Sequence, residues 1–126
     1  MITVGIGLAS GVTAAEVLAA VDAVLPHPAG PVAVATVDRR AREPGLRRAA
    51  AQRGWPLAGH PAEVLAAVRV PAPSTAVARR VGTPSVAEAA ALLTGGVLEV
   101  AKTVHGRVTV AVARAADPHP IHQEEP

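Results

Sequence analysis

The most informative stretch of this chain is Gly82-Thr83-Pro84-Ser85-Val86-Ala87-Glu88-Ala89-Ala90-Ala91-Leu92-Leu93. Gly82 is expected to end one helix, and Ser85 or Thr83 to cap the next, with Glu88 as the partner of Ser85 in a capping box. Gly95-Gly96 would end that helix. The runs 97–104 and 107–113 then predict a hairpin around His105-Gly106. Helix and strand signals therefore follow one another closely in this region.

Strand-like and helix-like segments also alternate before this stretch. The run 32–37 is continuously apolar, which suits a strand covered on both faces. Thr13 and Glu16 predict a capping box at the start of a first helix, and Pro44 predicts the start of a helix that Gly54 ends. The other expected elements are strands at 2–7 and 55–58, helices at 61–68 and 74–82, a proline linker at 70–73 and a polar loop at 38–43. The order predicts an α/β fold, a three-layer α/β/α sandwich with a mixed sheet of about five strands.

Length and composition limit the classes of function. The 126 residues suit one domain, expected at 1–114, with a disordered tail at 115–126. Trp55 is the only aromatic residue, so the ring platforms of single-strand nucleic-acid binders are missing. The absence of cysteine excludes thiol nucleophiles and zinc–thiolate sites, and His119 and His122 in the tail are too weak a signal to predict a metal. Without a leader or a membrane-spanning run, we expect a soluble, cytoplasmic protein.

The charge pattern shows one local excess. The formal net charge is only +2, but six arginines lie between positions 39 and 53. Such a cluster is usually a solvated helix face. It is also the kind of platform that binds carboxylates or phosphates, because arginine forks match these groups.

Glycines follow the first strand, at Gly5, Gly7 and Gly11. Their spacing is one residue longer than the dinucleotide fingerprint G-x-G-x-x-G, and no acidic residue stands at the expected distance. Nucleotide binding is therefore disfavoured. Tight packing against a neighbouring element is the favoured interpretation, and a close approach by a ligand is the alternative.

Seven polar residues, in three groups, have both a structural and a functional interpretation. Thr36, Asp38 and Glu43 lie at or after the end of the second strand, where ligands gather in open α/β sheets, but Asp38 would equally cap a turn. The caps Thr83, Ser85 and Glu88 would also form an anion site if their helix begins beside the sheet. Lys102 either protects an edge strand or points into a cleft.

Five segments, in order, resemble the cobalamin-biosynthesis family of CobE and the C-terminal domain of CbiG. They are Val4-Gly5-Ile6-Gly7; Ala35-Thr36-Val37-Asp38 with Glu43-Pro44-Gly45-Leu46; Val70-Pro71-x-Pro73-Ser74; Val81 to Ala91; and Lys102 with Thr109 to Arg114. The chain differs from the family in its first glycine loop, where Ala9-Ser10 replaces commonly basic residues. Arg39-Arg40 keeps the charge of a position that is commonly lysine.

The resemblance implies an α/β/α fold and a role in corrin-ring assembly. Full-length CbiG proteins resemble hydrolases that open the ring-A lactone of cobalt-precorrin-5A and release acetaldehyde, but the resemblance here covers only their C-terminal domain. It implies a precorrin or cobalt-precorrin as ligand, with no other cofactor and no metal. The expected binding residues are Gly5, Gly7, Thr36, Asp38, Glu43, Ser74, Thr83, Ser85, Glu88 and Lys102.

Whether the chain is an enzyme stays open at the level of sequence. Lactone hydrolysis would need a base, for which Asp38 and Glu88 are the candidates, whereas binding needs none. The alternative is a non-catalytic module that docks onto another corrin-pathway enzyme through an exposed apolar patch. Neither nucleic acid nor a membrane is an expected partner.

Overall fold

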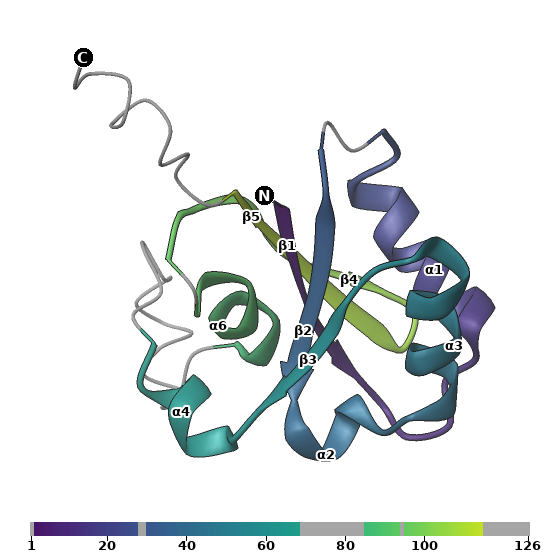
Figure 1. Cartoon of the computed structure of the whole chain (residues 1–126), viewed down its shortest axis with the longest axis horizontal. Coiled ribbons are helices and arrows are strands. Elements are labelled where there is room, and N and C mark those ends of the chain that lie inside the picture. Colours follow the sequence, from purple (N-terminus) through teal and green to yellow (C-terminus); the bar gives the residue numbers. More distant parts are fainter. Residues whose placement is uncertain (1, 28–29, 69–84, 94, 115–126) are drawn as a thin grey trace.

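A computed structural model describes residues 2–27, 30–68, 85–93 and 95–114 of the chain (Figure 1). Five strands form one sheet in the order β3-β2-β1-β5-β4. The central strand β1 runs parallel to β2, which is parallel to β3, and antiparallel to β5, which is antiparallel to β4. The strands are β1 (Ile2–Leu8), β2 (Val32–Val37), β3 (Leu57–His60), β4 (Val97–His105) and β5 (Val108–Arg114). The predicted mixed five-stranded sheet is therefore confirmed.

Helices cover both faces of this sheet. Figure 1 shows α1 (Ala14–Val24) and α3 (Pro44–Arg53) on one side, and α4 (Ala62–Ala66) and α6 (Val86–Leu92) on the other. A short helix, α2 (Asp38–Ala41), follows β2 directly. The three-layer α/β/α arrangement predicted from the sequence is present.

The core is built from small apolar side chains, so the layers pack closely. Valine and isoleucine side chains of β1, β2 and β5 pack against the buried stripe of α1 and α3. On the other face α6 contributes four buried alanines, Ala87, Ala89, Ala90 and Ala91. Gly5 lies under this helix, and a Cβ there would overlap the carbonyl oxygen of Ala87 and lie 2.6 Å from the nitrogen of Ala91. Alanine and glycine thus bring the backbone of α6 directly onto the sheet.

The predicted start of α1 and both predicted limits of α3 are confirmed, and the residues expected to set them do so. The capping box of α1 is complete, since Thr13 Oγ1 accepts from Glu16 N and Glu16 Oε1 accepts from Thr13 N. Pro44 begins α3, and Gly54 ends it with a φ of 71°, in the left-handed region that favours glycine. The predicted polar loop at 38–43 is wrong in part, because its first four residues form α2. A single helical turn is too short to leave a periodic pattern in the sequence.

The hairpin of β4 and β5 forms one edge of the sheet. Its turn lies at Gly106-Arg107, one residue later than predicted, and Gly106 has a φ of 64°. The pairing of β4 with β5 shifts register between Leu98 and Val100 and again between Val100 and Thr103. These irregularities twist an edge strand and leave part of its backbone unpaired with β5.

The helices of the described residues are all short. None of them has the length and apolar character needed to cross a membrane.

Candidate functional site

The candidate site lies where the parallel strands end. β1, β2 and β3 run in the same direction, so Leu8, Val37 and His60 stand at one edge of the sheet. Open α/β sheets bind ligands outside this edge. The sequence placed the expected site here, and the structure shows that α2 and the first turn of α6 meet β2 in this region.

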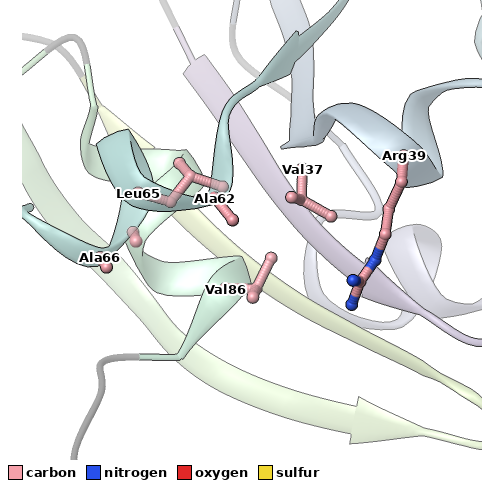
Figure 2. Close-up of a pocket in the computed structure, with 7 residues that line it drawn as sticks. Val37, Arg39, Ala62, Leu65, Ala66 and Val86 are labelled. Carbon is pink, nitrogen blue, oxygen red and sulfur yellow. The ribbon is translucent and has the colours of Figure 1, made fainter.

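A pocket of about 230 Å³ opens at this edge between α4 and α6 (Figure 2). Among the described residues, valine, leucine and alanine make up its walls, and Arg39 is the only charged lining residue. The lining residues are Val37 at the end of β2, Arg39 in α2, Ala62, Leu65 and Ala66 in α4, and Val86 and Ala89 in α6. The pocket is thus an apolar recess with a single cation at its rim.

Arg39 reaches this pocket because of its place in α2. Successive residues of a helix point in different directions, so the three polar residues 38–40 diverge. Asp38 is exposed and lies over β3, with Oδ1 2.9 Å from the position that a Cβ on Gly59 would occupy. Arg40 pairs with Glu43 at 3.3 Å. Arg39 points toward the start of α6, and its guanidinium lies on the side of Val86 (Figure 2).

The two glycines of β1 lie in different environments. Gly5 is buried under α6, as described above, which is the tight packing that the sequence favoured. Gly7 is half-buried, and a Cβ there would meet only the Cβ of Thr109, at 3.8 Å. Neither glycine lines the pocket.

Thr36 and Glu43 make hydrogen bonds that hold the sheet edge together. Thr36 is fully buried, and its Oγ1 donates to the carbonyl oxygen of Ile6 at 2.6 Å, which links β2 to β1. Glu43 accepts from Gly11 N with Oε1 at 3.1 Å and pairs with Arg40 through Oε2. Its carboxylate thus ties the glycine loop after β1 to the start of α3. Both side chains therefore have structural partners.

The residues at the start of α6 are engaged in the same way. Ser85 caps the helix by accepting from Glu88 N at 3.4 Å. Glu88 does not complete the predicted capping box, because Oε2 accepts from the backbone amide of Lys102 at 2.8 Å. That amide lies in the irregular part of β4, where pairing with β5 shifts. The Lys102 side chain is exposed on the edge strand, as the edge-protection interpretation expects.

None of the described residues predicted to bind substrate lines the pocket, and their binding roles stay predictions. Ser74 and Thr83 lie outside the described residues, as does the tail 115–126 with His119 and His122. Sequence reasoning included Arg39 in an arginine cluster that could bind carboxylates or phosphates, but did not count it among the expected binding residues. The signal was available, since Arg39 follows the end of β2 by two residues.

The shifted pKa values lie elsewhere in the described part of the chain. A hydrogen bond from Arg107 is the main cause that lowers the pKa of Glu16, and one from Arg53 lowers the pKa of Asp22. Both carboxylates belong to α1. In the same described ranges, no three histidine, aspartate or glutamate side chains come together as a metal site would need.

Comparisons with known proteins agree on one family. The family model described as cobalamin synthesis G C-terminus matches residues 2–113. The chain is similar to the crystal structure of CobE, a protein from the cobalamin (vitamin B12) biosynthetic pathway. The two sequences are 30% identical, and the TM-score is 0.75, with 93% of this chain and 95% of that chain covered. The cobalamin biosynthesis protein chiG from Agrobacterium tumefaciens str. C58 is 32% identical, with a TM-score of 0.68 over 93% of this chain and 100% of that one. No curated protein matches the chain. The chain belongs to the cobalamin synthesis G C-terminus family.

Proposed function

We propose that this protein binds a precorrin intermediate of cobalamin biosynthesis at the carboxyl edge of β1, β2 and β3. The observation that carries the proposal is the pocket between α4 and α6, which combines apolar walls with the cation of Arg39. A precorrin is a flat macrocycle edged with carboxylates. Arginine suits its edge, and the exposed Val86 and Ala62 suit its apolar parts.

Binding accounts for this geometry better than hydrolysis does. Asp38 and Glu88, the candidate bases, are not among the residues that line the pocket. Glu88 already accepts a hydrogen bond from the Lys102 amide, whereas the carboxylate of Asp38 has no hydrogen bond within the described residues. If the protein opens a lactone, Asp38 is therefore the better candidate for the base. We favour a protein that holds an intermediate without turning it over.

The test is an anaerobic titration with a late precorrin, followed by visible absorption and by an assay for acetaldehyde. We expect a saturable spectral shift without acetaldehyde. Release of acetaldehyde that Asp38→Asn abolishes would instead make the protein a hydrolase. The absence of any shift would contradict the proposal.

A matched pair of variants places the binding site. Val86→Asp puts a carboxylate into the pocket at the first turn of α6, where an acidic residue is favourable for the helix. Repulsion of substrate carboxylates should weaken binding about tenfold or more, as expected for one close pair of like charges. Val97→Asp makes the same change at an exposed position of β4 and should bind like the wild type. Equal affinities of the two variants would move the site away from this pocket.

A second candidate function, docking onto another enzyme of the same pathway, is favoured by the edge strand β4. Val97 and Val104 are 68% and 69% exposed there, although valine is normally buried. An edge strand also offers backbone groups to a partner strand. A protein that shows no spectral shift, yet co-elutes with a purified corrin methyltransferase and loses this association in Val104→Lys, would have the docking function.

A further inference from the structure

Arg39 is set apart from the other described arginines because it lines the pocket and has no ion pair among the described residues. Arg42, Arg47 and Arg48 have no ion pair there either, but they do not line the pocket. Arg40, Arg53, Arg107 and Arg114 each pair with a carboxylate at 3.3 Å or less. Within the described ranges the side chain of Arg39 makes no ion pair and no hydrogen bond, although Arg39 neighbours Asp38 in sequence. Its planar guanidinium is therefore free to bind a carboxylate through two parallel hydrogen bonds.

The walls of the pocket suit a short hydrocarbon segment. Val37 and Leu65 are buried, at 8% and 3% exposure, and form the floor, while Val86 is 40% exposed at the mouth. Figure 2 shows the side chains of Val37 and Val86 pointing into the space that Arg39 also enters. A ligand group that fits must therefore be apolar along its length and anionic near Arg39.

The size of the pocket limits that group further. The volume of the pocket is about 230 Å³. It is smaller than the range of about 300–1,000 Å³ that is usual for sites enclosing a drug-sized ligand. A macrocycle therefore cannot enter. A side arm of a few methylenes with a terminal carboxylate can.

We propose that the pocket receives one carboxylate-bearing side arm, with its methylenes against Val37, Leu65 and Val86 and its carboxylate on Arg39. The ring that carries the arm stays outside, over the mouth of the pocket. The identity of that ring as a corrin intermediate rests on the proposed function. The recognition of the arm rests on the pocket alone, so that the two can be tested separately.

Recognition of the side arm by the pocket is tested with propionate as the probe and propionamide as its uncharged isostere. We titrate the isotope-labelled full chain at constant ionic strength and follow backbone amide shifts by NMR. Propionate should shift the amides of Val37, Arg39, Leu65 and Val86 with an affinity on the order of millimolar, as expected for so small a ligand. Propionamide should bind at least about tenfold more weakly, because hydrogen bonds to charged groups are the stronger ones.

Substitutions of two exposed arginines identify the cation. Arg39→Gln should weaken propionate binding about tenfold or more, and Arg39→Lys should restore only part of it, because lysine lacks the planar fork. Arg48→Gln on α3 removes the same charge from a residue that does not line the pocket and should leave binding unchanged. Equal binding of propionate and propionamide, or to wild type and Arg39→Gln, would overturn the proposal. So would phosphate binding more tightly than propionate at this site.

A precorrin titration of Arg39→Gln separates this inference from the proposed function. Weakened precorrin binding, together with competition by propionate, supports both. Unchanged precorrin binding overturns the side-arm pocket and leaves the proposed function standing. Propionate binding that depends on Arg39, with no precorrin binding to the wild type, supports the pocket and overturns the proposed function.

Discussion

At the scale of single residues, Gly5 determines how closely the α6 layer approaches the sheet. A side chain at this position would overlap the backbone of Ala87, which cannot rotate away as a flexible side chain could. We predict that Gly5→Ala lowers the free energy of unfolding by about 3 kcal/mol, in the upper part of the overpacking range. Urea denaturation followed by circular dichroism measures this loss.

The control lies two positions along the same strand. Gly7→Ala meets only ordinary van der Waals contact with Thr109, at 3.8 Å. It should leave stability unchanged or raise it by up to about 1 kcal/mol, because alanine restricts the unfolded chain. Equal losses in the two variants would show that the close approach of α6 is not the cause.

The residues that line the pocket were harder to predict than the edge of the sheet at which the pocket opens. The sequence placed Asp38 and Glu43 at or after the end of β2, and the structure has Asp38 directly after β2 and Glu43 after α2, at the N-cap of α3. It could not tell that Glu43 would turn to Gly11 or that Arg39, and not Asp38, would line the pocket. Those outcomes depend on how α2 is oriented against α4 and α6, which are distant in sequence.

At the scale of elements, Glu88 links the edge strand β4 to α6 by a hydrogen bond. Its carboxylate accepts from the Lys102 amide, in the region where β4 departs from regular pairing with β5. We predict that Glu88→Ala speeds hydrogen exchange of the Lys102 amide about tenfold, as expected for the loss of a hydrogen bond to a charged group. Hydrogen exchange followed by NMR measures the exchange rate of the Lys102 amide directly.

Two further variants separate this hydrogen bond from the charge of the strand. Glu88→Gln keeps an oxygen that can accept from the amide and should retain most of the protection. Glu99 lies on β4, as Lys102 does, and Glu99→Ala removes its exposed ion pair with Arg114 of β5. Such exposed pairs contribute little to stability. The Lys102 amide of this variant should exchange like that of the wild type. Fast exchange in Glu99→Ala but not in Glu88→Ala would contradict the role of Glu88.

Elements with local signals were predicted well, and those without were not. Residues close together in the sequence determine the capping box of α1 and the limits of α3 at Pro44 and Gly54. Both predictions were confirmed. The third strand was expected at 55–58 but runs from Leu57 to His60, because its pairing with β2 determines where it begins. The tertiary partner, which the sequence does not display, sets such boundaries.

At the scale of the whole molecule, one ion pair joins regions near the two ends of the described chain. Arg107, in the β4–β5 turn, pairs with Glu16 in the first turn of α1 at 2.7 Å and also donates to the carbonyl oxygen of Gly11 at 3.4 Å. The side-chain hydrogen bond from Arg107 is the main cause that lowers the pKa of Glu16 below its ordinary value of 4.5, followed by the backbone hydrogen bond from Thr13. The hairpin is thus linked to α1 through Glu16 and to the glycine loop through Gly11, whose backbone N–H donates to Glu43.

The lowered pKa makes this link dependent on pH. A carboxylate whose pKa is lower in the folded state stabilises the fold above its ordinary pKa, and the stabilisation is lost as the pH falls through the folded value. Glu16→Gln removes the charge but keeps the capping box, because glutamine serves at that position. We therefore predict that wild type is more stable than Glu16→Gln at neutral pH, and that the difference closes below the ordinary value of 4.5. Urea denaturation of both proteins from neutral pH down to about pH 3 measures this difference in stability.

The control variant is Glu63→Gln, at an exposed residue of α4 with no ion pair in the described ranges. It should show no such closing difference. A gap between wild type and Glu16→Gln that stays constant across this range would mean that the charge of Glu16 does not carry the link.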